Sequence, residues 1–301
     1  MARRPEPDDL HRIKKLALVA MVSDDMLMNR LVLKGGNALD LVLKISTRAS
    51  VDLDFSMADS FLPGQLEDVR QRIEKRLIQV FSEEGFIVFD VTLTEKPPKL
   101  SEELVKFWGG YELNFKLVTK LFHDAHAGDV ESLRRNALEV APGQRTKFEI
   151  DISKHEFVGD KQQHDIDGYT VFVYSPNMLA TEKLRAICQQ MPEYGPVVKR
   201  TRLGSARARD FLDLKTIIDS CKIDLTDAAN IATLVNVFNA KHVPLELLGK
   251  ISGTREFHQQ DWPSVEQTVK RGTKLASFDE YFDFVVSLAN QLLAAAKPDG
   301  T

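Results

Sequence analysis

A glycine turn followed by two closely spaced aspartates is the feature that most constrains this chain. The two segments read KGGNAL at residues 34–39 and RASVDLDF at residues 48–55. Side chains alternate between the faces of a strand, so Asp52 and Asp54 share one face while Val51 and Leu53 point into an apolar layer. Two carboxylates held this close repel each other unless a cation lies between them. The pattern therefore predicts a site for Mg²⁺ or Mn²⁺ that leaves coordination positions for substrate phosphates.

The overall composition is that of a globular protein and excludes several classes. The formal net charge of -4 gives no general attraction to nucleic acid, so contact with a polyanion requires a local basic patch. Cys188 and Cys221 are the only cysteines, which argues against a disulfide framework and fits a reducing compartment. No apolar run approaches the ~18 residues of a membrane span. We expect a cytoplasmic, monomeric protein with no membrane contact.

The order of predicted elements indicates an α/β fold of the mixed, α+β kind, with a mixed-sheet half over residues 1–175 and an all-helical half over residues 176–301. In the first half we expect helices at 8–29, 36–44 and 65–84, and strands at 31–34, 52–55, 86–94, 111–121, 146–153 and 169–174. In the second half we expect helices at 177–190, 205–220, 226–240 and 278–296. We therefore expect the site to lie in a cleft between the two halves.

A later strand supplies a third acid. Residues 148–152 read FEIDI, and a neighbouring position in the sheet would bring Asp151 beside Asp52 and Asp54. Three acids can hold two metal ions ~4 Å apart, the arrangement used in phosphoryl and nucleotidyl transfer. Glu149 lies on the same strand face as Asp151 and is an alternative third ligand.

These motifs resemble a known family. A glycine turn, an Asp-x-Asp strand and a later single Asp are typical of the nucleotidyltransferases related to DNA polymerase β. More closely, the segments at 34–39 and 48–55 resemble the AbiEii/AbiGii toxin family, which includes the MenA-type toxins. The resemblance continues in EKLRA at 182–186 and RDFLDL at 209–214, so four motifs occur in order over roughly residues 31–215. The last ~85 residues carry no motif of that family.

The resemblance implies a function. Members are toxins of toxin–antitoxin or abortive infection operons that transfer nucleotides from NTP, and in the best-understood cases the acceptor is the 3′ end of tRNA. The expected activity is therefore a metal-dependent nucleotidyltransferase that modifies tRNA and blocks translation. The expected partners are NTP, an RNA acceptor and a cognate antitoxin protein.

Residue roles follow from the same resemblance. It implies metal binding by Asp52 and Asp54, phosphate contact by Lys183, and a further acid required for activity at Asp210. The nucleotide-binding residues that it implies are Gly35, Gly36, Asn37, Arg48, Ser50 and Lys183. Asn37 stands where the family often has Thr or Ser, which puts the detail of triphosphate contact in question.

Each residue also has an ordinary structural explanation. Gly35 and Gly36 suit any strand-to-helix turn, and no Gly-Lys-Ser/Thr follows to make a P-loop. Lys183 is compatible with plain surface charge on a helix. Asp210 is compatible with an ion pair to Arg209, and Asp213, three residues later on the same helical face, is a candidate structural partner of Asp210. The combination of motifs, rather than any one residue, favours the catalytic interpretation.

A basic segment precedes the Asp210 helix. Its cations are Lys199, Arg200, Arg202, Arg207 and Arg209. Such a cluster can neutralise RNA phosphates and release their counterions, and it is equally compatible with a solvated loop. We expect it to be the RNA-binding surface.

Two alternatives of other kinds stay open. The chain could be a nucleotidyltransferase that modifies a protein or small molecule and makes no use of the basic segment. It could also be a catalytically inactive binding member of the fold. His123 and His126 have a spacing seen in zinc sites, but no cysteine or further nearby histidine completes a set.

Overall fold

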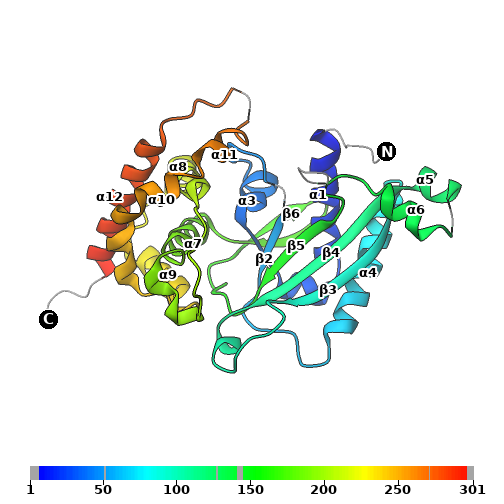
Figure 1. Cartoon of the computed structure of the whole chain (residues 1–301), viewed down its shortest axis with the longest axis horizontal. Coiled ribbons are helices and arrows are strands. Elements are labelled where there is room, and N and C mark those ends of the chain that lie inside the picture. The colour runs from blue at the N-terminus through cyan, green and yellow to red at the C-terminus, as the bar shows by residue number, and fades with distance from the viewer. Residues whose placement is uncertain (1–6, 51, 127, 141–144, 271, 297–301) are drawn as a thin grey trace.

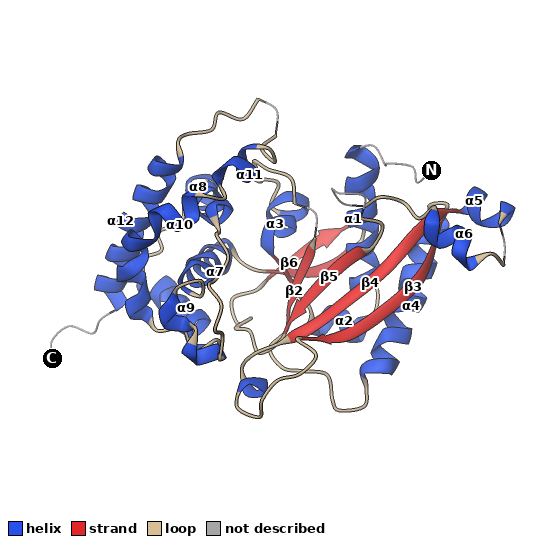
Figure 2. Cartoon of the chain, in the orientation of Figure 1, coloured by secondary structure: helices blue, strands red, loops and turns tan. Residues whose placement is uncertain are grey.

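The computed structural model describes residues 7–50, 52–126, 128–140, 145–270 and 272–296. Val51, expected to face the apolar layer, lies outside these residues. Seven strands of the described chain form one mixed sheet in the order β3-β4-β5-β2-β1-β7-β6, with helices on both sides (Figures 1 and 2). The strands are β1 Val32–Lys34, β2 Leu53–Ser56, β3 Phe86–Lys96, β4 Gly110–Thr119, β5 Phe148–Ser153, β6 Gln162–Ile166 and β7 Tyr169–Val173.

The register at the centre of the sheet determines which side chains share the cleft face. β2 runs antiparallel to β1 and parallel to β5, and β5 runs antiparallel to β4. Four residues consequently stand in one row across four strands, namely Lys34, Asp54, Asp151 and Glu112. Residues opposite each other in neighbouring strands point to the same face, so the sheet itself gathers three carboxylates and one lysine.

Two helices cover the other face of the sheet. They are α1 (Pro7–Val22), which also contacts β7, and α4 (Leu66–Glu83), which packs along β3 (Figure 1). The buried residues of α4, Val69, Ile73, Leu77 and Phe81, recur every four positions and form one apolar stripe. This periodicity is why the sequence predicts α4 closely.

The first predicted helix, 8–29, is wrong as a single element. It breaks after α1, and α2 (Asp25–Arg30) begins in a new direction. Asp24 has extended backbone, and its buried carboxylate accepts hydrogen bonds from the amides of Met26 (3.1 Å) and Leu27 (3.2 Å). An aspartate at such an N-cap starts a new helix even where the apolar pattern continues.

The sequence did not reveal strand β6. Its residues, QQHDI, are polar and mostly exposed, so they lack the alternation of a half-buried strand. β6 forms the edge of the sheet and joins β7 through a two-residue turn, Asp167-Gly168, in which both residues have positive φ. Such a turn fits the twist of a hairpin, so turn chemistry and pairing with β7 place this strand.

The remaining helices lie mostly after residue 175. The helices not yet named are α3 Gly35–Asn37, α5 Lys120–Ala125, α6 Val130–Arg135, α7 Pro176–Cys188, α8 Ala208–Cys221, α9 Ala228–Asn239, α10 Arg255–Gln259, α11 Trp262–Glu266 and α12 Phe278–Ala296. A π-helical turn covers Ala38–Val42, and 3-10 turns cover Leu104–Lys106, Pro192–Tyr194, Pro196–Val198 and Leu245–Thr254. The predicted α/β class with a helical C-terminal region is confirmed.

The apolar core continues from the sheet into the helical region. α7 packs against both α8 and α9, and buried side chains of the sheet and of these helices belong to one cluster. α7 begins at Pro176, after Ser175 caps the amide of Met178. The division at residue 175 into two domains stays a prediction. Within the described residues, no helix combines the length and apolar character needed to cross a membrane.

Candidate active site

A cleft of about 530 Å³ lies between the central strands and helices α7 and α8. One wall carries Gly35, Asp52 and Asp54, and the opposite wall carries Lys183 and Asp210. The structure thus brings together residues from all four sequence motifs. Most of its lining is polar or charged, as expected for a site that accepts a charged substrate.

The two predicted metal ligands have no counter-charge bound to them. Within the described chain, the carboxylates of Asp52 and Asp54 make no hydrogen bond or ion pair. Asp151 lines the same cleft, but its Oδ1 lies 2.8 Å from the Nζ of Lys96, which also binds Glu112. Glu149 is not part of the lining and faces Lys147 at 3.4 Å. The geometry therefore favours Asp151 over Glu149 as the acid nearest the pair.

The surroundings of Asp52 and Asp54 disfavour the ionised form of both carboxyl groups. Burial raises the pKa of Asp54 to about 6, and the neighbouring Lys34 offsets this only in part. Burial also raises the pKa of Asp52, and the negative charges of Glu149 and Asp151 add to the effect. A cation bound between the two carboxylates would remove this penalty.

The carboxylates of Asp52 and Asp54 suit a divalent metal ion as two of its ligands. Asp52 and Asp54 offer unpaired carboxylate oxygens, the ligands that Mg²⁺ and Mn²⁺ prefer. Among the described residues, no group of three or more histidine, cysteine, aspartate or glutamate side chains has metal-binding geometry. Asp151 is held by Lys96, so its place as a third ligand stays a prediction. His123 and His126 belong to no group of three or more potential metal ligands among the described residues.

The glycine turn has a specific steric role. Gly35 has φ +70°, and a Cβ at this position would lie 2.6 Å from Oδ2 of Asp54. A Cβ at Gly36 would lie equally close, 2.6 Å, to Oγ of Ser50. The absent side chains thus leave room for Asp54 and Ser50 beside the turn. Their predicted contact with a triphosphate stays a prediction.

Asn37 and Arg48 have structural partners. Asn37 is fully buried, and its amide donates to the carbonyl oxygen of Asp52 at 2.5 Å, so this side chain holds the backbone at Asp52, just before β2. Asn37 is not among the lining residues, whereas Ser50 and Arg48 are. Arg48 forms a two-bond ion pair with Asp213, Nε to Oδ1 at 2.9 Å and Nη2 to Oδ2 at 2.6 Å.

A buried ion network forms the helical wall. Nζ of Lys183 lies 3.1 Å from Oδ1 of Asp210 and 2.7 Å from Oδ2 of Asp213. Arg207 binds the other oxygen of Asp210. Burial alone would raise the pKa of Asp210, but Arg207 and Lys183 hold it well below its usual range. Asp213 is thus a partner of Lys183 and Arg48 rather than of Asp210 directly.

The predicted basic segment does not form one surface. Lys199 binds Glu103 at 2.6 Å, and Arg200 donates to the carbonyl of Gln189 at 2.9 Å near the end of α7. Arg207 and Arg209 line the cleft, where Arg209 is exposed and has no ion pair within the described residues. Arg202 is exposed and equally unpaired there. Three of the five cations are therefore engaged by the protein itself.

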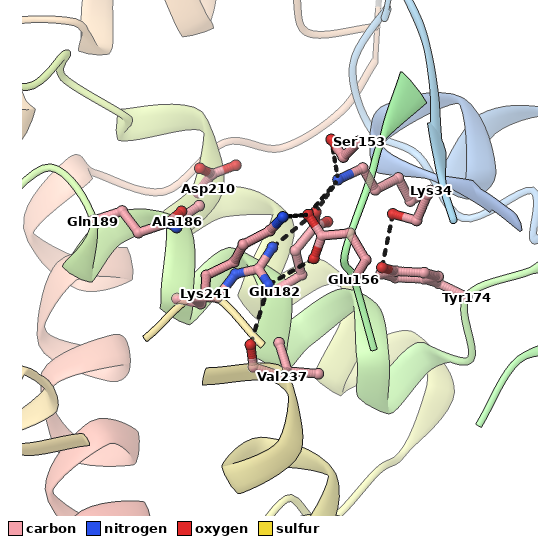
Figure 3. A network of polar contacts seen from close by, with 12 residues as sticks. Lys34, Ser153, Glu156, Tyr174, Glu182, Ala186, Gln189, Asp210, Val237 and Lys241 are labelled. Carbon is pink, nitrogen blue, oxygen red and sulfur yellow. Dashed lines mark hydrogen bonds and ion pairs between the residues drawn. The ribbon is translucent and has the colours of Figure 1, made fainter. Parts of the chain in front are cut away.

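Sequence reasoning missed a second buried network (Figure 3). Lys34 lies 2.6 Å from Glu182 and 3.2 Å from the hydroxyl of Ser153, and Arg185 lies 2.7 Å from Glu156. Lys34 and Glu182 belong to the glycine and lysine motifs, so their charge was visible in the sequence. Their pairing was not, because 148 positions separate them.

Removing Asp213 should destabilise the protein strongly. Asp213→Asn would leave Lys183 and Arg48 buried with one carboxylate fewer, and breaking such a pair typically costs about 3 to 5 kcal/mol. We expect denaturant unfolding to show a loss of this order. Asp219→Asn on the same helix removes an exposed ion pair with Lys215 and should cost under about 1 kcal/mol. Equal losses in the two variants would contradict the network.

Asp54→Asn should stabilise the metal-free protein at neutral pH. The folded pKa of about 6 lies above the ordinary value of 3.8, so the free energy of unfolding falls as pH rises through this interval. Asparagine does not ionise, and the gain should reach roughly 1 to 3 kcal/mol above pH ~7 and vanish near pH ~4. Urea unfolding in a chelator, with the exposed Asp68→Asn as control, measures it. An equal gain at both pH values would refute this account of Asp54.

The chain is similar to solved structures at low sequence identity. The comparison with curated proteins found no significant match. One similar solved structure is a proposed nucleotidyltransferase from H. pylori, at 15% identity, with 97% of each chain covered and a TM-score of 0.48. Another is JHP933 from Helicobacter pylori, at 16% identity, with 98% of this chain and 95% of that chain covered and a TM-score of 0.48.

The family model gives the assignment. The model described as the nucleotidyl transferase AbiEii toxin of a type IV toxin–antitoxin system matches residues 16–284. The match spans most of the sequence and includes both walls of the cleft. It confirms the resemblance seen in the four motifs, and the chain therefore belongs to the AbiEii nucleotidyl transferase toxin family.

Proposed function

We propose that this protein is a metal-dependent enzyme that transfers nucleotides from NTP to an RNA acceptor, the 3′ end of tRNA, and thereby blocks translation. One observation carries the proposal. Asp52 and Asp54 stand unpaired on one wall of a polar cleft, while the opposite wall holds the buried Lys183–Asp210 pair. A structural role would leave two neighbouring carboxylates neutralised, and the described residues do not neutralise them.

Asp52 and Asp54 would hold Mg²⁺ or Mn²⁺. When bound, the metal supplies Lewis-acid activation of the attacking oxygen and charge stabilisation at the phosphate. The proposed reaction is in-line attack of an RNA 3′-hydroxyl on the α-phosphorus of NTP, with pyrophosphate as the leaving group. Asp151, freed from Lys96, would be a third ligand.

Cationic side chains of the helical wall suit the triphosphate. Arg207 and Arg209 line the cleft from the start of α8, and Lys183 is fixed between Asp210 and Asp213. Transfer of a nucleotide spreads negative charge over the nonbridging oxygens, so fixed cations near them lower the barrier. Lys183 would act from its buried position as part of this positive wall.

Exposed arginines without a carboxylate partner among the described residues favour a polyanionic acceptor. Arg209 and Arg202 are exposed and, within the described residues, bound to no carboxylate, and Arg145 is exposed beside the Asp52 loop. An RNA backbone would neutralise them and release counterions. Because the family consists of toxins of toxin–antitoxin systems, we propose a cognate antitoxin as partner and the cytoplasm as the place of action.

Asp52→Asn should abolish most of the activity and preserve the fold. The change removes one metal-binding charge, and we expect a loss of about a hundred- to several-thousand-fold in transfer rate, or about 3 to 5 kcal/mol. The assay incubates purified protein with total cellular RNA, magnesium and each labelled NTP in turn. Asp68→Asn, on the far side of the sheet, is the matched control.

The same assay separates the alternatives. Label in tRNA supports the proposed acceptor, and label in protein or small molecules instead supports the other transferase. Growth inhibition by Asp52→Asn equal to that of wild type would support an inactive binding member. Absence of labelled RNA with every NTP would remove the RNA-transferase proposal.

Charge reversal should distinguish the two ends of the basic segment. Arg209→Glu places a negative charge in the cleft mouth and should weaken RNA binding and reduce the salt dependence of its affinity by about one counterion. Lys199→Glu affects a cation already bound to Glu103 and should leave RNA affinity within about twofold of wild type. Titration with tRNA at several salt concentrations measures both. An equal loss in the two variants would contradict the split seen in the structure.

A further inference from the structure

We propose that the end of the cleft formed by Trp108 and Gln189 is the nucleobase site of the NTP, where Trp108 stacks on the base and the carboxamide of Gln189 reads its edge. The inference rests on the proposed function, because it names the specificity residues of the same site. Both residues line the cleft, at the end away from Asp52 and Asp54.

The sheet register gives the order of groups along the cleft. Asp54 is opposite Asp151, and two residues farther along β5 Ser153 is opposite Gly110 of β4. Trp108 precedes Gly110 by two residues, so it lies beyond Ser153 on the side away from Asp52. Trp108 is four residues from Glu112, which stands in one row with Asp151 and Asp54. A rise of about 3.3 Å per residue therefore places its backbone roughly 13 Å along the sheet from that row. A substrate whose α-phosphate sits at the carboxylates would extend its nucleoside toward Trp108.

The backbone before β4 is shaped to present Trp108. Gly109 has φ +100°, and a Cβ at Gly110 would lie 2.2 Å from the carbonyl oxygen of Ile152. At position 110 only glycine fits this close approach of β4 to β5. The positive φ of Gly109 turns the chain just after the tryptophan. The ring packs 6.2 Å from that of Tyr194, and Nζ of Lys241 lies 5.7 Å from its centroid. Trp108 is thus a supported, partly exposed aromatic platform.

Lys183, Ala186 and Gln189 follow one another at a spacing of three residues, and all three line the cleft. Figure 3 shows Ala186 and Gln189 next to each other. The amide nitrogen of Gln189 has one long contact, 3.5 Å to the hydroxyl of Tyr194. Its side-chain oxygen accepts no hydrogen bond from the described residues. The carboxamide thus keeps an acceptor and a donor hydrogen for a ligand, the pair of functions needed to read the edge of a base.

The charge distribution distinguishes the Trp108–Gln189 end of the cleft from the end that would hold the phosphates, near Asp54 and Arg209. The cations that line this end are engaged: Lys96 by Asp151 and Glu112, Arg185 by Glu156, and Lys241 by the carbonyls of Phe107 and Lys154. Arg209 lines the cleft elsewhere and has no ion pair with any residue that the structure describes. An aromatic ring and a neutral amide suit an uncharged base, and stacking on such a ring tolerates every base. Selectivity among bases would then come from Gln189.

Equilibrium binding of the four NTPs tests the inference. Trp262→Phe leaves Trp108 as the single tryptophan, because the chain has two, and its fluorescence then reports the site. We expect NTP to quench it, and Trp108→Ala to weaken all four NTPs about tenfold or more, with Trp108→Phe restoring most of the affinity. Variant binding is measured by calorimetry. Inorganic tripolyphosphate, which has no base, should bind all variants equally.

Gln189→Leu tests the recognition step. It should shrink the ratio of affinities between the preferred and the poorest NTP by about fivefold or more, while tripolyphosphate affinity stays unchanged. Gln291→Leu, an exposed change on α12, is the matched control. An equal loss for all four NTPs, a parallel loss for tripolyphosphate, or no quenching would overturn the inference. Because binding is measured without an acceptor, a protein that selects among NTPs but labels no RNA would refute the acceptor and support the nucleobase site.

Discussion

The buried ion pairs across the seam between sheet and helices are the constraint on which the rest of this structure depends. Neighbouring residues of α7 reach in different directions: Glu182 binds Lys34 of β1, and Lys183 binds Asp210 and Asp213 of α8. Arg48, from the loop before β2, also binds Asp213 and so connects this loop to α8. Buried ion pairs contribute little net stability, because desolvation offsets their attraction, but they tolerate only one arrangement of the partners. They therefore fix the width of the cleft.

The cleft is electrostatically uneven, and this asymmetry indicates its chemistry. On the helical wall nearly every buried charge has a partner, whereas on the sheet wall Asp52 and Asp54 form no ion pair with any residue that the structure describes. The sheet creates this imbalance directly, because its register aligns Asp54, Asp151 and Glu112 in one row. Of the lysines beside that row, Lys34 binds Glu182 and Lys96 is shared between Asp151 and Glu112. Within the described residues, neither lysine forms an ion pair with Asp52 or Asp54.

Local patterns predicted much of the fold. The four-residue periodicity of Val69, Ile73 and Leu77 predicts α4, and the alternation in β5 places Asp151 on the same face of the sheet as Asp54. Strand β6 escaped detection because an exposed edge strand carries no periodic apolar signal, and the break at Asp24 escaped it because one capping residue interrupts a continuing pattern. The candidate site residues were predicted from the combination of motifs, and residues of all four motifs line one cleft. Their network of partners was not predicted. Pairs such as Lys34 and Glu182 depend on tertiary packing that no local window contains.

α7 mechanically couples side chains that lie in different parts of the cleft. This helix carries Glu182, which binds Lys34 of the sheet, and Lys183, which binds Asp210 and Asp213, and Gln189 follows directly at its C-terminal end. The three cannot move independently, so a tilt of this helix would displace all three side chains together and change both ends of the cleft at once.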